Sequence, residues 1–131
     1  MNFGYTIIYV DDVPATLAFY DKAFGLATRF LHESNGYGEL ETGATTLSFA
    51  AHEVAEQNLP GGYSRISPEG QPCGMEIGLT TTDVPGAFEK AVEAGATPLA
   101  EPKTKPWGQV VAYVRSIEGT LVELCSPMVA P

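Results

Sequence analysis

Residues 5–14, YTIIYVDDVP, are matched 71 positions later by residues 76–85, EIGLTTTDVP. In both stretches a short strand-like run leads into Asp-Val-Pro, and a helical pattern follows. Asp12 and Asp83 are suited to cap a helix through their side chains, and the proline beside each cap lacks an N–H that has no helical partner there. The chain of 131 residues is therefore expected to contain one structural unit twice.

The residues after each Asp-Val-Pro predict the rest of the unit. Val13, Leu17, Tyr20 and Phe24 recur at helical intervals, and Gly25 and Gly95 stand where the two helices are expected to end. Turn residues then separate three strand candidates in each copy. These are residues 28–33, 37–41 and 45–50 in the first copy, and 97–100, 109–114 and 120–125 in the second. Each copy is thus strand, helix, strand, strand, strand.

The fold class expected from this pattern is α+β, with two βαβββ repeats forming curved mixed sheets around a cleft. One domain covers 1–131, with repeat one at 3–51, a linker loop at 52–72 and repeat two at 73–127. Both faces of the first strand are apolar and require burial, so the two sheets are expected to face each other. Strict alternation would line the cleft with Tyr5, Ile7, Tyr9, Glu76, Gly78, Thr80, Leu121, Glu123 and Cys125.

Composition excludes several partners. The chain has 16 acidic and 7 basic residues, a net charge of −9 and no basic cluster, so nucleic acid and anionic membranes would be repelled. No apolar run approaches the ~20 residues of a membrane span, and residues 1–5 show no signal peptide. Two cysteines without Cys-x-x-Cys spacing fit a reducing cytosol, so a cytoplasmic location is expected. The acidic surface would attract a cationic small molecule.

The sequence resembles the vicinal oxygen chelate superfamily, which includes glyoxalase I, extradiol dioxygenases, fosfomycin-resistance enzymes and bleomycin-resistance proteins. The resemblance rests on Asp12-Val13-Pro14, on Phe19-Tyr20 with Phe24-Gly25-Leu26, and on the closing run from Glu118 to Leu124. Ser116-Ile117-Glu118 replaces the family's Asp-Pro-Asp before that run. The resemblance to this superfamily implies the glyoxalase/bleomycin-resistance-like fold, a small-molecule ligand and a homodimer.

The resemblance also implies four metal-ligand positions, on the first and fourth strands of each repeat. They are occupied by Tyr5, Ser48, Glu76 and Glu123, of which only the two glutamates are ligand types. Two carboxylates alone hold zinc or nickel poorly, so no cofactor is expected. A divalent metal is the alternative, held by Glu76 and Glu123, and a hard ion such as magnesium would suit them. Neither His32 nor His52 lies at a ligand position.

Glu76 and Glu123 are the candidate catalytic residues. Turned into the cleft, they would bind a cationic group or act as a general base. The alternative is that they are solvated at the cleft rim or paired with Arg29, Arg65 or Arg115. Tyr5, Tyr9, Ser48, Trp107 and Gln109 are the candidate ligand-binding residues, because they share the cleft or belong to a segment common in glyoxalase-like relatives. Cys125 is expected to be buried and inert.

Two functions compete. The first is a metal-free binding protein of the bleomycin-resistance type, which holds a cationic or aromatic molecule in the cleft. The second is a glyoxalase-like metal-dependent lyase or dioxygenase that acts on a small oxygenated metabolite. A binding domain for a regulatory metabolite is a third. Tyr5 and Ser48 are not metal-ligand types, which favours the metal-free binding protein. The frequency of enzymes in the superfamily favours the metal-dependent enzyme, so whether the protein is an enzyme stays open.

Overall fold

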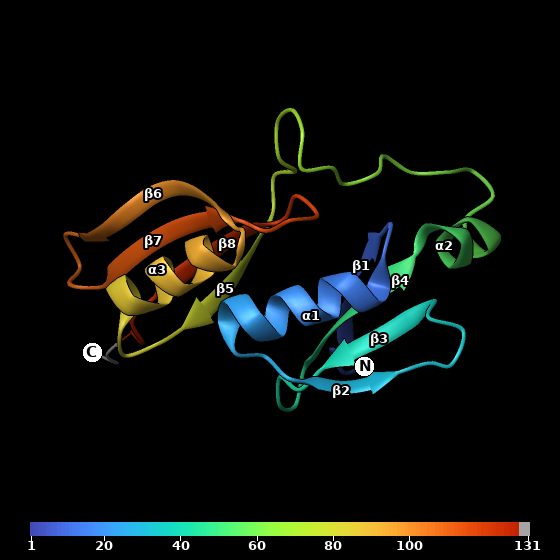
Figure 1. Ribbon diagram of the computed structural model, residues 1–131, viewed down its shortest axis with the longest axis horizontal. Helices are drawn as coiled ribbons and strands as arrows, with labels where there is room; N and C mark the ends of the chain where they lie inside the picture. The colour runs from blue at the N-terminus through green and yellow to red at the C-terminus, as the bar shows by residue number, and fades with distance from the viewer. Residues whose placement is uncertain (129–131) are drawn as a thin grey trace. The chain divides into compact units, whose positions relative to one another are not determined.

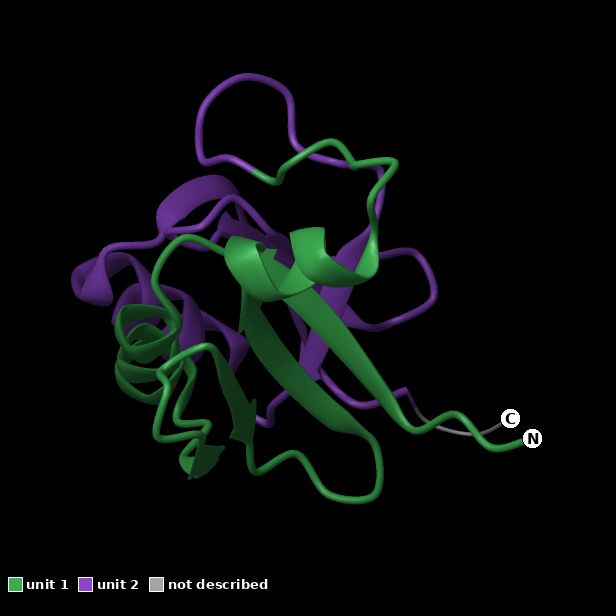
Figure 2. Cartoon of the chain, turned by 90° about the vertical axis from the view of Figure 1, so that its right-hand side faces the viewer, with its two compact units in different colours: residues 1–66 green, residues 67–131 purple. Residues whose placement is uncertain are grey.

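The chain forms two compact units in a computed structural model that describes residues 1–128. Unit 1 is Met1–Ile66 and unit 2 is Ser67–Pro131. Figure 1 shows the elements of each unit, and Figure 2 gives each unit its own colour. Each unit contains one four-stranded sheet made only of its own strands. Within residues 1–128, no helix is long and apolar enough to cross a membrane.

Unit 1 has the strand, helix and three-strand order that the sequence predicts. Its elements are β1 (Tyr5–Val10), α1 (Val13–Phe24), β2 (Thr28–Leu31), β3 (Tyr37–Leu40), β4 (Thr46–Ala51) and α2 (His52–Asn58). The sheet has the order β1-β4-β3-β2. Strand β1 runs parallel to β4, and the other neighbours are antiparallel.

Unit 2 repeats this topology. Its elements are β5 (Glu76–Thr80), α3 (Val84–Ala94), β6 (Thr97–Thr104), β7 (Val110–Arg115) and β8 (Leu121–Cys125). The sheet order is β5-β8-β7-β6, with β5 parallel to β8. The prediction of an α+β fold made of two βαβββ repeats is therefore confirmed.

The repeated Asp-Val-Pro starts both helices as expected. A carboxylate oxygen of Asp12 accepts a hydrogen bond from Ala15 N, and one of Asp83 accepts from Gly86 N, each at 3.0 Å. Gly25 ends α1 with a φ of 70°, in the left-handed region that favours glycine. Two local rules of helix capping thus fix where each helix begins and where α1 ends.

Each sheet packs one face against its long helix. In β1, Ile8 and Val10 are buried, whereas the alternate residues Tyr5 and Ile7 are 59% and 37% exposed. Gly38 of β3 lies directly below α1, since a Cβ there would come within 2.5 Å of Leu17. Helix α3 packs in the same way on β6, β7 and β8. We call the face turned away from α1 or α3 the helix-free face of each sheet.

The structure differs from the sequence-based expectation in two places. The expected linker loop 52–72 begins with helix α2, which has no side-chain cap at Ala51 and no glycine at its end. Because it has neither a capping side chain nor a terminal glycine, this seven-residue helix could not be predicted from the sequence. Strand β6 extends to Thr104, past the expected 97–100. It tolerates Pro98 and Pro102 because it lies at the edge of its sheet.

Residues 67–70 pack against the turn between β7 and β8 and accept hydrogen bonds from Arg115, at the end of β7. The Arg115 guanidinium donates to Ser67 O at 2.6 Å and to Gly70 O at 2.8 Å. Gly119 in that turn has a φ of 109°, and a Cβ on it would lie 2.2 Å from Ser67 O. Only glycine allows the backbone of residue 67 to approach so closely.

We expect Gly119→Ala to destabilise the protein by about 1 to 3 kcal/mol, because alanine adds both a strained φ and a backbone clash. Urea unfolding measures this loss. The matched control is Gly108→Ala, which has a similar φ of 93° but nothing within 4 Å of the added Cβ. Equal losses in the two variants would show that the contact with Ser67 has no energetic role.

Candidate functional site

A pair of glutamates lies on the helix-free face of unit 2. Glu76 begins β5, and Glu123 lies in the neighbouring strand β8, where it pairs with Gly78. Interaction with the neighbouring Glu123 side chain is the main cause that raises the pKa of Glu76 above its ordinary value. Partial burial and the charge of Glu123 raise this pKa further. Neighbouring carboxyl groups resist ionising together, so Glu76 holds its proton more tightly than an isolated glutamate does.

Two further groups surround this pair. Tyr113 of β7 lies opposite Glu123 in the antiparallel ladder, and burial raises its pKa, with the two glutamates adding to the effect. Cys125 is buried and its thiol donates to Leu79 O at 3.7 Å. Burial followed by the charge of Glu123 raises the pKa of this thiol. A protonated, buried thiol is a poor nucleophile, so the chemistry of this face rests on the glutamates and the tyrosine.

The arginines are engaged elsewhere. Arg29 pairs with Glu39 at 3.2 Å and with Glu41 at 3.8 Å. Arg65 pairs with Glu56, and Arg115 binds backbone carbonyls. Within residues 1–128, no ion pair involves Glu76 or Glu123. Within unit 2, Arg115 therefore does not neutralise Glu76 or Glu123.

Strand registers identify the equivalent positions of unit 1. Ser48 pairs with Ile7, two residues after Tyr5, just as Glu123 pairs with Gly78, two residues after Glu76. A phenol and a hydroxyl thus replace the two carboxylates. Ser48 is fully buried and donates to Thr6 O at 3.2 Å. Tyr37, next to Ser48 and Glu39, donates its hydroxyl proton to Glu39 at 2.7 Å.

The donor atoms do not fit a transition metal. Catalytic zinc sites use three protein ligands, mostly imidazole, thiolate or carboxylate. Unit 2 offers two carboxyl groups, and unit 1 offers a phenol and a serine hydroxyl at the equivalent positions. No group of three or more His, Cys, Asp or Glu residues in 1–128 is placed to hold a metal ion.

Trp107 and Gln109 interact with each other in the turn between β6 and β7. The indole N–H of Trp107 donates to Gln109 Oε1 at 2.9 Å, and the Gln109 amide donates to Ser126 O at 2.9 Å. Trp107 is nevertheless 63% exposed, so its ring is oriented but open to solvent. Tyr9 packs its ring on that of Tyr63 at 5.0 Å. The roles of all these residues in ligand binding, and the cleft itself, stay predictions.

Sequence reasoning missed Tyr113 and Tyr63. Alternation along residues 110–115 could have placed Tyr113 on the same face as Glu123, because both lie on neighbouring strands of one repeat. Tyr63 lies in an irregular segment, where no period exists to orient a side chain.

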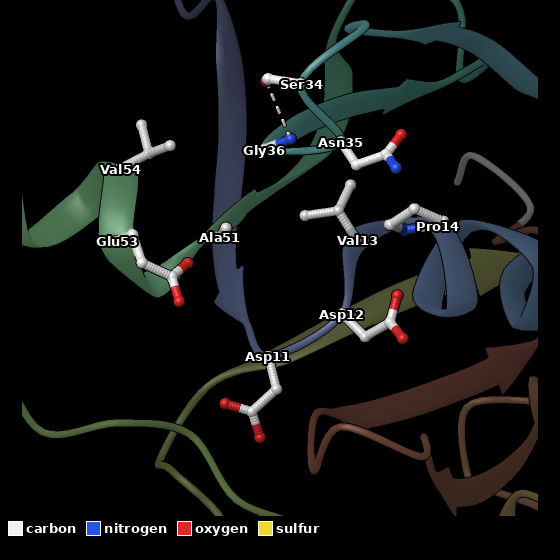
Figure 3. A pocket seen from close by; sticks show the side chains of 10 residues that line it. All are labelled: Asp11, Asp12, Val13, Pro14, Ser34, Asn35, Gly36, Ala51, Glu53 and Val54. Carbon is white, nitrogen blue, oxygen red and sulfur yellow. Dashed lines mark hydrogen bonds between the residues drawn. The ribbon is translucent and has the colours of Figure 1, made fainter.

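Two pockets lie at the starts of the long helices. A pocket of about 370 Å³ beside α1 is lined by the carboxylates of Asp11, Asp12 and Glu53 and by Val13 and Val54 (Figure 3). A pocket of about 330 Å³ beside α3 contains Asp83, Val84 and Pro85. The two surround equivalent Asp-Val-Pro residues, so they are a repeated feature at the start of the helices, and neither is lined by a site residue predicted from the sequence.

The glutamate pair predicts a pH dependence of stability. The folded chain keeps a proton on Glu76 that the unfolded chain releases above pH 4.5, so this stabilising contribution is complete at low pH and is lost as the pH rises through the raised pKa. We expect the stability of the protein, relative to Glu123→Gln, to fall as the pH rises above 4.5. Urea unfolding at a series of pH values measures the difference, and a constant difference would contradict the interaction of Glu76 with Glu123.

The family model of the Glyoxalase/Bleomycin resistance protein/Dioxygenase superfamily matches residues 2–124. A glyoxalase-related enzyme from Fulvimarina pelagi superposes with a TM-score of 0.84 at 20% identity, covering 100% of this chain and 91% of that one. A family enzyme from Burkholderia phytofirmans gives 0.77 at 24% identity, with 96% and 98% covered. A superfamily member from Sphaerobacter thermophilus gives 0.71 at 20%, with 97% and 98% covered. No curated protein matches the chain.

Proposed function

Because the chain belongs to the glyoxalase/bleomycin resistance protein/dioxygenase superfamily, we propose that it binds a small cationic or aromatic molecule through Glu76 and Glu123. The observation that carries this proposal is that the two carboxyl groups contact each other on the helix-free face and have no arginine or lysine ion pair within residues 1–128. An acidic pair without a protein cation is suited to accept the cation of a ligand.

The surroundings of the pair support this choice of ligand. Tyr113 lies beside Glu123 and supplies an aromatic ring, which favours a flat or quaternary cation. The net charge of −9 attracts cations over about 10 Å at 0.1 M salt. In this proposal the ligand cation pairs with Glu76 and Glu123, and Tyr113 packs on the ligand body. The remaining candidate residues contact the rest of the ligand; they are Tyr5, Tyr9, Ser48, Trp107 and Gln109.

The protein is proposed to work without a transition metal, since two of the four ligand positions of the family hold Tyr5 and Ser48. Purified protein is therefore expected to contain far less than one zinc, nickel or iron per chain by elemental analysis. A stoichiometric metal would overturn the proposal and favour the second candidate, a metal-dependent lyase or dioxygenase acting on an oxygenated metabolite. That candidate rests on the two glutamates that keep the ligand type.

A thermal-shift screen tests the ligand class. Benzyltrimethylammonium and larger cationic aromatic compounds are expected to raise the melting temperature, and added salt should weaken the effect. The glutathione hemithioacetal of methylglyoxal is an anion and is expected to have little effect. Greater stabilisation by the anionic adduct would contradict the charge argument, and its turnover would establish the glyoxalase activity.

Assembly and location belong to the same proposal. The family commonly forms dimers, so sedimentation is expected to give twice the 13.9 kDa of one chain. Cys73 and Cys125 are both free, as in proteins of the reducing cytoplasm. A monomer at micromolar concentration would contradict the first statement, and export of the protein would contradict the second.

A further inference from the structure

Three side chains from separate segments of unit 1, those of Tyr63, His52 and Asp11, are linked by polar contacts. Tyr63 places its hydroxyl 2.6 Å from His52 Nδ1, and Asp11 places a carboxylate oxygen 3.4 Å from His52 Nε2. His52 is only 4% exposed, while the Asp11 side chain is 90% exposed and Tyr63 is half-buried. A buried imidazole thus connects an accessible phenol to an accessible carboxylate, all three within unit 1.

The chemistry of the partners assigns the proton positions. An ionised Asp11 can only accept, so Nε2 of His52 carries the ring proton that faces it. Nδ1 is then a bare acceptor, and the Tyr63 hydroxyl donates to it. A nucleophile within 2.6–3.2 Å of a base, with a third group orienting that base, is the arrangement that activates side-chain hydroxyls in enzymes.

Packing holds the phenol in this position. The plane of the Tyr63 ring lies within 20° of the imidazole plane, with the ring centroids 5.8 Å apart, and the Tyr9 ring lies 5.0 Å from Tyr63. Arg65 lies 4.0 Å from Asp11 and also pairs with Glu56, so it keeps a positive charge beside the carboxylate. Burial raises the pKa of Tyr63, with Arg65 lowering it less. The phenol therefore keeps its proton at rest and must pass it on to react.

We propose that Asp11, His52 and Tyr63 form a proton relay that makes the Tyr63 hydroxyl an acyl-accepting nucleophile towards activated carbonyl compounds. The Tyr63 oxygen attacks the carbonyl carbon of an aryl ester, and its proton passes to His52 Nδ1. The bond from the carbonyl carbon to the aryloxide breaks, and the aryloxide leaves. The resulting imidazolium is stabilised by Asp11, and the products are O-acyl Tyr63 and the aryloxide.

The relay distinguishes Tyr63 from the other tyrosines on the helix-free face of unit 1. Tyr37 donates its hydroxyl to the carboxylate of Glu39. Tyr5 is more exposed, at 59%, but within residues 1–128 no hydrogen bond joins it to a histidine. Exposure alone would favour reaction at Tyr5, whereas the relay favours Tyr63. The two tyrosines therefore form an internal comparison within one molecule.

The test is acetylation of the full-length protein by p-nitrophenyl acetate, followed by peptide mapping. We expect Tyr63 to be acetylated at least about tenfold faster than Tyr5, since a positioned general base contributes 10²–10⁴-fold. His52→Gln should reduce the rate at Tyr63 to that of Tyr5 or below, and Asp11→Asn should reduce it partly. His32→Gln is the matched control, because the His32 ring interacts with Ser34 and Phe30 and with no tyrosine hydroxyl in residues 1–128, and it should leave the rate unchanged.

A second measurement needs no variant. Nitrogen-15 NMR of the wild-type protein should show His52 as the tautomer with the proton on Nε2. The proposal is overturned if Tyr63 reacts no faster than Tyr5, if His52→Gln folds and leaves the rate unchanged, or if His52 carries its proton on Nδ1. Similar rates at every tyrosine in His52→Gln, together with loss of its circular dichroism signal, mean unfolding, and the wild-type rates and the tautomer then decide.

Discussion

Replacing Phe49 with alanine is expected to lower the free energy of unfolding by about 3 to 5 kcal/mol, the largest effect of any substitution considered for this chain. Phe49 lies in β4 with no exposed surface, and its ring contacts that of Tyr20 at 4.8 Å. Tyr20 is also fully buried and belongs to the apolar stripe of α1. Truncation would leave a cavity between the helix and the sheet. Urea unfolding followed by circular dichroism measures the loss.

Two controls make this prediction specific to the buried position. Leu124 pairs with Leu79 as Phe49 pairs with Ile8, so it is the equivalent residue of unit 2. Leu124→Ala should cost about 2 to 5 kcal/mol. Phe30→Ala removes the same side chain from a position that is 46% exposed and should cost much less. Similar losses for Phe30→Ala and Phe49→Ala would contradict the assignment of the core.

Glu123→Gln is expected to weaken the binding of a cationic aromatic ligand by about 10- to 100-fold. Glutamine keeps the size of the side chain but removes the charge, and a hydrogen bond to a charged group is worth about 1.5 to 3 kcal/mol. The dissociation constant of benzyltrimethylammonium, or of the best cation from the thermal-shift screen, is measured by calorimetry. Glu76→Gln is expected to act in the same direction.

The control for Glu123→Gln is Glu93→Gln. Glu93 is an exposed residue of α3, which packs on the opposite face of the same sheet, so the variant changes the net charge equally without touching the pair. Glu93→Gln should alter ligand binding only through the long-range electrostatic field, so added salt should abolish its difference from the wild-type protein. Unchanged binding in both Glu76→Gln and Glu123→Gln would show that the two acids have no role in ligand binding.

The fold could be predicted because its determinants are local and occur twice. Asp12 and Asp83 cap helices through contacts only three residues away, and the apolar stripe of α1 is visible in the order of residues alone. Alternation along β1 likewise separates buried Ile8 from exposed Ile7. Each of these features depends only on residues close in the sequence. Because the same pattern occurs in both halves of the chain, both repeats were expected to have the same topology.

The partners of the site residues could not be predicted, because they depend on three-dimensional neighbours. Nothing in the order of residues distinguishes Glu76 paired with Glu123 from Glu76 paired with Arg115. The strand register decides it, together with the carbonyls of residues 67–70 that bind the arginine. His52 and Tyr63 are separated by an irregular segment, so their contact is equally invisible in the sequence.

The self-contained sheets bear on how the chain folds as it is synthesised. All strands of the first sheet lie between residues 5 and 51, so its strand pairing needs no later segment of the chain. At about 5–20 residues per second, a ribosome needs roughly 3 to 13 s to add the second unit, while hairpins form in about 1–10 μs. The nascent chain can therefore complete its first sheet and bury Phe49 without waiting for any strand of unit 2, so that few unpaired strands are left for chaperones or neighbouring nascent chains to capture.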